Sequence, residues 1–318
     1  MSGKNITMVG GSGFVGTVIA TRLSSRGDNV TIITRSREDA KHLWPLPNAQ
    51  VVEMDVFDTK TLGKLLTGQD VMLNLVGILN EKKDNGEGFH HAHVALTEQL
   101  LAACEKTGLS RYLHMSALGA DSFAPSYYLR TKGEAENKVL AAGDRSLNVT
   151  IFRPSVIFGQ GDGMFNRFHQ LLKISPVLPL ACAKSRFQPV FVGDVADAFI
   201  RALDDKSTYG RKYDLGGPEI VTLKEIVDYV NQLSGLKRVV MPLGEGLTKL
   251  QAQIFEHLPG KPFSKDNLRS ASEDNVIVNE NGLKLLGIEP TAFRSIVPKY
   301  ISGNARSHYN ALRSNAKR

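Results

Sequence analysis

Two residues with complementary acid–base chemistry, Tyr128 and Lys132, lie four positions apart in the segment Tyr128-Leu-Arg-Thr-Lys132. If this segment is helical, both side chains lie on one helix face and share a pocket. A nearby ammonium favours the phenolate, so we expect Lys132 to lower the pKa of Tyr128 and make it a proton donor or acceptor near neutral pH. The pattern also occurs by chance, so its place in the fold decides its meaning.

A glycine-rich segment near the N-terminus has the spacing of a dinucleotide-binding loop. An apolar run at 6–9 leads directly into Gly10-Gly-Ser-Gly13-Phe-Val-Gly16, and a helix-like stretch follows at 17–23. Gly10 permits a tight turn, Gly13 lets a pyrophosphate approach the backbone, and Gly16 lets the helix pack on the sheet. The free N–H groups at the helix start favour phosphate. The alternative is a plain structural turn.

The residues after the second apolar run, Val30 to Thr34, bear on cofactor choice. Arg35-Ser36-Arg37 stand where an NAD-preferring site usually has Asp or Glu. A carboxylate repels a 2'-phosphate, whereas a guanidinium holds it with paired, charge-assisted hydrogen bonds. We therefore predict NADP(H) as the cofactor, with NAD(H) bound less well. The alternative is that both arginines are solvated surface charge.

Strand-like and helix-like segments alternate along the first half of the chain, which predicts an α/β fold with a doubly wound parallel sheet. Further strand-like runs are 51–54, 71–76, 111–115 and 149–152, and helix-like stretches are 59–66, 89–106 and 132–142. The tyrosine–lysine pair falls between the fifth and sixth strands. Asp55 closes the third strand, where it either reaches an adenine amino group or serves as a cap or turn residue.

Length and composition fit one nucleotide-binding domain with a smaller partner. The chain has 318 residues, of which 42% are hydrophobic and 22% charged. We expect an NADP(H)-binding domain at 1–160 and 188–218, a smaller substrate or partner lobe at 161–187 and 219–300, and a basic tail at 301–318. Two cysteines indicate a reducing compartment. With no signal segment and no run of ~20 apolar residues, we expect a cytoplasmic protein, with peripheral attachment at the inner face of a membrane as a second option.

Charge and apolar patterning raise the question of a partner. The net charge is +7, and no acidic residue follows Glu289. This tail is either a solvated end or a surface for anionic lipid or a larger assembly, and no nucleic-acid-binding module accompanies it. Apolar residues between Leu247 and Leu258 have the spacing of one helix face. They serve core packing, or they face a membrane, a partner or a hydrophobic substrate such as a quinone or an apolar carbonyl.

Longer motifs extend these patterns over nearly the whole chain. They are Arg153-Pro-Ser-Val-Ile-Phe-Gly159, Gln188-Pro-Val-Phe-Val-Gly-Asp194-Val-Ala-Asp197 and Tyr213-Asp-Leu-Gly-Gly-Pro218. With the glycine loop and the tyrosine–lysine pair, they resemble the extended short-chain dehydrogenase/reductase superfamily. Asn74-Leu-Val-Gly77, Leu113-His-Met-Ser-Ala-Leu-Gly-Ala-Asp121 and Tyr128-Leu-Arg-Thr-Lys-Gly-Glu134 are similar to its atypical branch, which contains the nucleotide-binding accessory subunit of respiratory complex I and bacterial relatives.

The resemblance implies site residues and also shows departures. Tyr128, Lys132 and Ser116 are the implied catalytic residues, but the usual serine position falls on Ala117 or Leu118, and the usual asparagine position holds His93. Ser116 either reaches a substrate oxygen or is a strand-end hydroxyl bonded to backbone. The cofactor contacts expected are Gly10, Gly13, Phe14, Val15, Gly16, Arg35, Ser36, Arg37, Asp55, Val56, Leu75, Val76, Gly77, Lys132, Pro154 and Val156.

Two functions remain open from the sequence. One is a cofactor-binding accessory protein linked to the respiratory chain or to quinone, which the departures at the serine and asparagine positions favour. The other is an active NADP(H)-dependent reductase or sugar-nucleotide epimerase or dehydratase that uses Tyr128 and Lys132. We expect no metal site, because His90, His91 and His93 fall on different helix faces without a Cys or acidic partner nearby, so that they are surface or packing residues.

Overall fold

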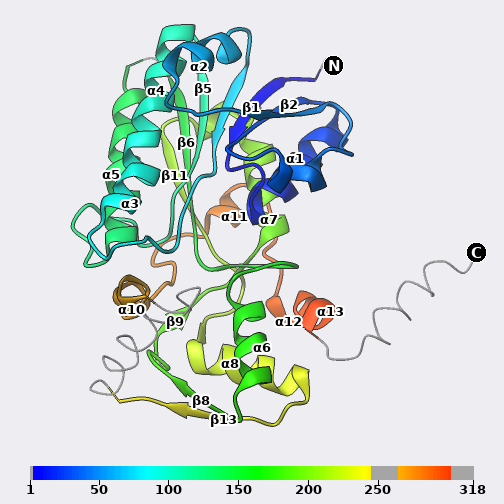
Figure 1. Cartoon of the computed structure of the whole chain (residues 1–318), viewed down its shortest axis with the longest axis vertical. Coiled ribbons are helices and arrows are strands. Elements are labelled where there is room, and N and C mark those ends of the chain that lie inside the picture. The colour runs from blue at the N-terminus through cyan, green and yellow to red at the C-terminus, as the bar shows by residue number, and fades with distance from the viewer. Residues whose placement is uncertain (1–2, 146, 245–263, 302–318) are drawn as a thin grey trace, which may run out of the picture. The chain divides into compact units, whose positions relative to one another are not determined.

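The computed structural model describes residues 3–145, 147–244 and 264–301 (Figure 1). The chain divides into two compact units. The first comprises residues 1–154, 192–215 and 277–289, and the second comprises 155–191, 216–276 and 290–318. Residues 277–289, which we expected in the smaller lobe, thus belong to the first unit.

A seven-stranded parallel sheet forms the centre of the first unit (Figure 1). Its strands are β1 (Asn5–Val9), β2 (Asn29–Thr34), β3 (Ala49–Glu53), β4 (Val71–Asn74), β5 (Arg111–Met115), β6 (Asn148–Pro154) and β11 (Arg211–Leu215). The order is β11-β6-β5-β4-β1-β2-β3, so the chain reverses its direction of travel between β1 and β4. Ligands of such sheets bind outside the carboxyl ends of the strands at this switch point. The predicted doubly wound α/β fold is confirmed.

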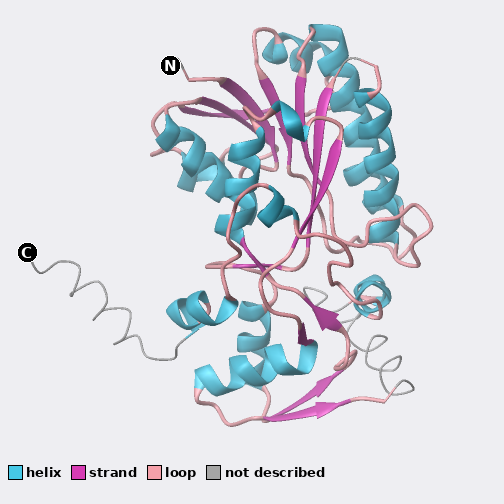
Figure 2. Cartoon of the chain, turned by 180° about the vertical axis from the view of Figure 1, so that it is seen from behind, coloured by secondary structure: helices cyan, strands magenta, loops and turns pink. Residues whose placement is uncertain are grey.

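Helices cover both faces of this sheet. In the first unit they are α1 (Phe14–Arg26), α2 (Thr59–Leu66), α3 (Glu87–His90), α4 (Leu96–Thr107), α5 (Tyr127–Gly143), α7 (Val192–Ala202) and α11 (Gly282–Leu285), with 3-10 turns η1 (Glu38–Leu43) and η3 (Lys206–Thr208). Helices α2, α4 and α5 lie on one face, and α1 and α7 pack together on the other (Figures 1 and 2). The predicted helix at 89–106 contains a π-helical turn, η2 (His91–Ala95), between α3 and α4.

Strand β11 was not among the predicted strands. It lies at the edge of the sheet beside β6, and Arg211 and Lys212 at its start are exposed, whereas Tyr213 and Leu215 are buried. The run of apolar residues that would indicate a strand here is therefore short. Helix α11 packs against this strand, and a Cβ at Gly282 would lie only 2.8 Å from Cβ of Tyr213.

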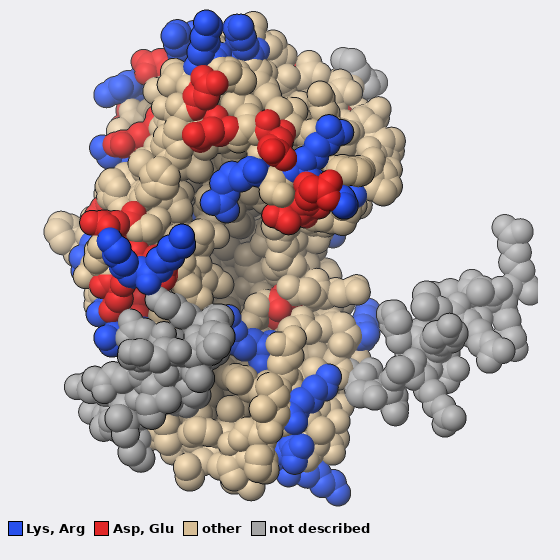
Figure 3. Space-filling view, viewed as in Figure 1, with Lys and Arg blue, Asp and Glu red and all other residues tan. Residues whose placement is uncertain are grey.

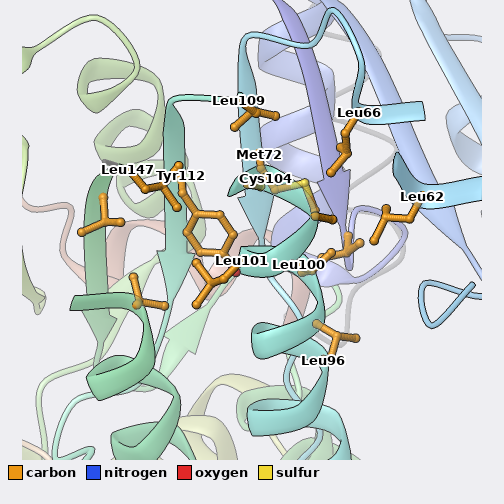
Figure 4. Packing of buried hydrophobic residues seen from close by; sticks show 14 of the residues in the cluster. Leu62, Leu66, Met72, Leu96, Leu100, Leu101, Cys104, Leu109, Tyr112 and Leu147 are labelled. Carbon is orange, nitrogen blue, oxygen red and sulfur yellow. The ribbon is translucent and has the colours of Figure 1, made fainter. Parts of the chain in front are cut away.

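Side chains of α2, α4 and β5 build the main core of the first unit (Figure 4). Leu100 of α4 and Tyr112 of β5 are fully buried there. The Tyr112 hydroxyl accepts a hydrogen bond from Asn74 Nδ2 at 3.0 Å, so the buried phenol has a polar partner. Burial raises the pKa of the Cys104 thiol to about 12, which makes this cysteine a packing residue and not a nucleophile.

The second unit has small paired strands and short helices. Its elements are β7 (Ile157–Phe158), α6 (Phe165–Ile174), β8 (Val177–Leu180), β9 (Arg186–Phe187), β10 (Val190–Phe191), β12 (Val221–Thr222), α8 (Leu223–Ser234), β13 (Val239–Pro242), α10 (Lys265–Ala271), α12 (Phe293–Ile296) and α13 (Pro298–Ile301). Phe158, Phe165 and Phe293 pack ring to ring at its centre. The apolar stripe between Leu247 and Leu258 lies outside the described residues. None of the helices described is long and apolar enough to cross a bilayer.

Leu100→Ala should lower the free energy of unfolding of the first unit by about 2 to 5 kcal/mol, because it removes a fully buried side chain and leaves a cavity. The single tryptophan, Trp44, belongs to this unit, so its fluorescence during urea titration reports the effect. Leu79→Ala is the matched control, since Leu79 is 59% exposed. Equal losses in both variants would contradict this account of the core.

Candidate functional site

The turn after β1 places a glycine loop at the switch point. Gly10 has a φ of +76°, and its carbonyl accepts a hydrogen bond from the Gly13 N–H at 3.2 Å. A Cβ at Gly10 would lie 2.9 Å from the carbonyl carbon of Leu75, at the end of β4. The loop after β1 therefore touches the loop after β4, and only glycine fits both the conformation and the space.

The N-terminus of α1 has the properties of a phosphate site. No side chain caps this helix, its first turn contains no acidic residue, and it begins at Phe14 and Val15 directly after the exposed Gly13. A Cβ at Gly13 would meet only the Gly10 carbonyl oxygen, at 3.4 Å, so the space above the loop is open. A Cβ at Gly16, in contrast, would lie 2.3 Å from that oxygen, because α1 packs closely on the loop. The open side and the unpaired N–H groups suit a pyrophosphate.

The segment after β2 carries two arginines in different environments. The Arg35 side chain is exposed, and the structure gives it no ion pair among the described residues. The Arg37 backbone N–H donates to Glu53 Oε2 at 2.6 Å, and its guanidinium lies 5.4 Å from the centre of the Trp44 ring. Ser36 lies between them, with its hydroxyl accepting from the Asp39 N–H. Arg35 is thus the cation that remains available to a ligand here.

The turn after β3 uses Asp55 as a turn residue. Its Oδ1 accepts a hydrogen bond from the Phe57 N–H at 3.0 Å, while Asp58 caps α2. Val56 packs partly against the core. The turn role weighed for Asp55 is therefore present, and contact with an adenine stays a prediction.

Lys132 ties α5 to the sheet beside the glycine loop. Its side chain is buried, and Nζ donates to the carbonyl oxygens of Val76, at 2.9 Å, and Met115, at 3.0 Å. These carbonyls follow or close β4 and β5. Burial lowers the pKa of Lys132 to about 8, against the opposing effect of Glu136 one turn later. A Cβ at Gly77 would lie 3.3 Å from Nζ, so the exposed Gly77 leaves room beside the ammonium.

Tyr128 is the second residue of α5, one turn before Lys132, and is half-buried. Its ring lies edge-on to Phe89 and to His93, with ring centres 6.2 Å and 5.6 Å away. Burial raises the pKa of Tyr128 to about 12. This direction is opposite to the one expected from the sequence, because the desolvation of the phenol dominates and the Lys132 ammonium is held by backbone carbonyls.

Ser116 is bonded to a carboxylate, not to the backbone. Its Oγ donates to Glu136 Oε1 at 2.5 Å. Glu136 is buried and also pairs with Arg153, at 3.1 Å, and with Lys212, at 2.6 Å. The serine hydroxyl therefore belongs to a buried charge cluster that joins α5, β6 and β11.

His93 occupies the π-helical turn η2 and faces the site. Its Nε2 accepts a hydrogen bond from the Ile78 N–H at 3.2 Å, and its Nδ1 lies 2.9 Å from Thr131 Oγ1. Because Thr131 Oγ1 donates to backbone carbonyls of α5, Nδ1 is the protonated nitrogen. Burial, with a smaller effect of Lys132, lowers the pKa of His93 to about 2. The histidine is a neutral link between the loop after β4 and α5.

The other histidines divide between interior and surface. His114 of β5 is buried, neither ring nitrogen has a hydrogen-bond partner among the described residues, and burial holds its pKa well below the usual range. His90 and His91 are exposed. Across the described ranges, no group of His, Cys, Asp and Glu has the arrangement of a metal site.

The remaining candidates are split between the two units. Leu75 is buried and its N–H donates to the Val9 carbonyl at 3.0 Å, so it joins β4 to β1. Pro154 ends β6 in the first unit, and its carbonyl accepts from the Leu118 N–H. Val156 belongs to the second unit. The first unit therefore brings together the glycine loop, Leu75 to Gly77, Ser116, Tyr128 and Lys132.

Sequence reasoning missed Glu136, Arg153 and Thr131 as parts of this site. Glu136 lies four residues after Lys132, the same spacing that links Lys132 to Tyr128, and this was the available signal. Arg153 opens a recognised motif, but nothing local indicates that it pairs with Glu136. These contacts depend on strand order and appear only in the folded chain.

Comparison with known proteins finds relatives over nearly the whole chain. The profile described as the NAD dependent epimerase/dehydratase family matches residues 6–216. The chain is similar to NADH dehydrogenase (ubiquinone) 1 alpha subcomplex subunit 9, mitochondrial, of Arabidopsis thaliana, with 30% identity over 95% of this chain and 76% of that protein. It is also similar to the NADH-ubiquinone oxidoreductase 40 kDa subunit, mitochondrial, of Neurospora crassa, with 26% identity over 98% of this chain and 82% of that protein.

Solved structures have the same fold. The dTDP-glucose 4,6-dehydratase DesIV from Streptomyces venezuelae, with NAD and TYD bound, has a TM-score of 0.74 and 18% identity, and the match covers 96% of this chain and 98% of that chain. This match shows the fold. The family profile and the two relatives confirm the resemblance predicted from the sequence.

His93→Gln should reduce the slope of stability against pH below neutrality by the share of one proton, while the buried His114 keeps its own share. Because the pKa of His93 is about 2 in the folded chain and near 6.5 when unfolded, its contribution is complete above pH 6.5 and is lost as the pH falls. The slope attributable to one proton is about 1.4 kcal/mol per pH unit. Urea unfolding at about pH 7.5 and at about pH 5, on either side of the unfolded pKa, measures this slope.

Gln keeps one donor and one acceptor without titrating in this range. His90→Gln is the control, because His90 is exposed, and it should leave the wild-type slope unchanged. A wild-type slope in His93→Gln would show that the buried ring does not resist protonation.

Proposed function

The chain belongs to the NAD dependent epimerase/dehydratase family, and from that premise we propose that it is an NADP(H)-holding accessory protein of the respiratory NADH dehydrogenase. In this role the nucleotide is a retained ligand that stabilises the fold, and the protein does not turn it over. A ligand that binds only the folded chain stabilises it by an amount set by its concentration and dissociation constant.

The observation that carries this proposal is the hydrogen bond from Ser116 Oγ to Glu136. A serine that assists proton transfer must offer its hydroxyl to the substrate, but this one is bonded to a buried carboxylate that also pairs with Arg153 and Lys212. The raised pKa of Tyr128, about 12, acts in the same direction, because the phenol is then a weak acid near neutral pH. The glycine loop and Lys132 are thus suited to binding a nucleotide, whereas the Ser116 hydroxyl and the Tyr128 phenol are poorly suited to proton transfer.

The residues that would hold the dinucleotide come from Lys132 of α5 and from segments at the carboxyl ends of five strands, β1, β2, β3, β4 and β6. The loop from Gly10 to Gly16 suits the pyrophosphate, and the segment from Leu75 to Gly77, with Lys132, suits ribose hydroxyls. Asp55 and Val56 are the candidates for the adenine, and Pro154 is the candidate for the nicotinamide end. When bound, the nicotinamide supplies hydride chemistry.

NADP(H) is favoured over NAD(H) by the charge after β2. Arg35 is exposed and has no competing ion pair among the residues described, so its guanidinium is available to a 2'-phosphate. Arg37 has its guanidinium on the Trp44 ring. We assign the main phosphate contact to Arg35, with Ser36 and Arg37 beside it.

The names of two relatives support a respiratory complex as the partner. Two proteins with similarity over most of this chain are named as subunits of NADH dehydrogenases that act with ubiquinone. Their names support association with a respiratory complex, and ubiquinone is then the nearest candidate for a hydrophobic small molecule.

A second candidate function is an active NADP(H)-dependent reductase or epimerase. It is favoured by one observation, the retention of Tyr128 and Lys132 on the same face of α5. In that case the Tyr128 hydroxyl transfers the proton and Lys132 orients the ribose.

Arg35→Glu should weaken NADPH binding by roughly 1.5 to 3 kcal/mol and leave NADH binding nearly unchanged, because a charge-assisted contact to the 2'-phosphate is lost. Titration calorimetry with both nucleotides measures the two affinities. Arg145→Glu is the control, since it makes the same charge change at an exposed residue just after the C-terminal end of α5. Equal losses for NADPH and NADH would refute the assignment of Arg35.

Tyr128→Phe distinguishes the two functions. For an accessory protein, this variant should keep its NADPH and its association with respiratory membranes, whereas Lys132→Met should release the nucleotide faster because the ammonium is lost. Nucleotide content after purification and the rate of NADPH release measure both effects, and thermal melting confirms that each variant is folded.

The same variants test for turnover. Wild-type protein is first screened for NADPH oxidation with carbonyls, sugar nucleotides and quinones. An activity that falls by roughly 10² to 10⁴ in Tyr128→Phe, with NADPH affinity unchanged, would establish the enzyme instead of the accessory protein.

A further inference from the structure

A two-stranded ribbon in the second unit exposes one of its faces. Strands β8 and β13 pair in parallel, with Val177 opposite Val239 and Pro179 opposite Met241. Side chains alternate between the faces of a strand, so Leu178 and its partner point the other way, into the core formed with α6 and α8. Both helices contact the ribbon from that side (Figures 1 and 2). The opposite face carries only apolar side chains.

These side chains are well exposed. Val177 is 41% exposed, Val239 60% and Met241 48%. Ile174, at the end of α6 and three residues before Val177, is 82% exposed. We call these four residues the apolar ribbon face. Single exposed apolar residues are ordinary, but three on one small ribbon, with a fourth at the end of the helix that leads into it, indicate a contact surface.

Cations flank the apolar ribbon face. Lys173 precedes Ile174, and Lys237 and Arg238 precede Val239. Lys173 and Lys237 are exposed and make no ion pair within the described ranges, while Arg238 Nε donates to the Leu172 carbonyl at the end of α6, at 3.0 Å. The lysine charges are therefore available to an external partner.

The surrounding sequence contains no compensating acid. Residues 163–193, which include α6 and β8, have no Asp or Glu, and neither do residues 229–244, which include β13. Figure 3 shows Lys and Arg with broad uncharged areas on the surface that the second unit provides. An apolar row beside unpaired cations complements a partner that offers both hydrocarbon and a high density of negative charge.

We propose that the apolar ribbon face docks on the surface of a bilayer that contains anionic phospholipid. The four apolar side chains enter the boundary between headgroups and acyl chains, and the two lysines lie at the level of the lipid phosphates. An acidic protein partner would satisfy the lysines, but a bilayer also accepts a flat apolar row without needing a complementary shape. The proposal goes beyond nucleotide binding, which rests on the first unit alone.

The test uses the full chain in flotation with vesicles of phosphatidylcholine, with or without phosphatidylglycerol. The protein should float with the anionic vesicles alone and be released by raised salt. Each lysine near the surface is expected to contribute about fivefold, so Lys173→Gln with Lys237→Gln should lower the partition coefficient roughly 25-fold. The control pair, Lys64→Gln with Lys106→Gln, makes the same charge change on exposed residues of the first unit and should float like wild type.

A second pair of variants tests the apolar contribution. Ile174→Ser with Met241→Ser should abolish flotation, whereas Val278→Ser with Leu285→Ser, two exposed residues of the first unit, should not affect it. NADPH retention should be unchanged in all variants, so failure here is distinct from failure of the nucleotide proposal.

Three results would overturn the proposal. The first is equal flotation with neutral and anionic vesicles. The second is salt-sensitive flotation that neither the lysine pair of variants nor the apolar pair changes. The third is a wild-type protein that does not float and forms a dimer, which Ile174→Ser with Met241→Ser dissociates. The second would assign the lipid contact to another surface of the chain, and the third would make the ribbon an interface between copies.

Discussion

The buried ammonium of Lys132 is the constraint from which the arrangement of the site follows. A charge removed from water must be held by hydrogen bonds, and here the carbonyls of Val76 and Met115 accept them. These two carbonyls belong to neighbouring parts of the sheet, so one side chain joins α5, the loop after β4 and the end of β5. The glycine loop touches the same loop at Leu75. A shift of α5 would therefore also move the loops after β1 and β4, which we propose to hold the nucleotide.

Glu136 extends this constraint to the other strands. It lies one turn after Lys132, raises the lysine pKa against the effect of burial, and pairs with Arg153 of β6 and Lys212 of β11. A buried carboxylate needs several partners, and Ser116 becomes one of them. Stabilising the charge cluster and presenting a serine to a substrate are competing uses of one hydroxyl. In this chain the Ser116 hydroxyl donates to Glu136. This is the physical reason for favouring nucleotide binding over turnover.

His93 forms a second link between the loop after β4 and α5. It links the Ile78 N–H to Thr131 of α5 and contacts the edge of the Tyr128 ring. The π-helical turn that contains it widens the helix locally, as such turns often do at functional sites. Because the proposed nucleotide site belongs to one unit and the apolar ribbon face to the other, the two proposals concern separate cores.

The sequence by itself determined the fold class and the place of the candidate site at the ends of the strands. Apolar runs, glycine spacing and the period of a helix are local properties, so they placed the loop from Gly10 to Gly16 at a strand end and Tyr128 with Lys132 on one helix face. The edge strand β11 was missed because charged residues begin it. Tertiary structure alone decided that Ser116 bonds to Glu136, that the pKa of Tyr128 rises, and that Val239 and Met241 are exposed while Val240 faces the core. Each of these depends on burial and on partners far away in the sequence, which no local pattern encodes.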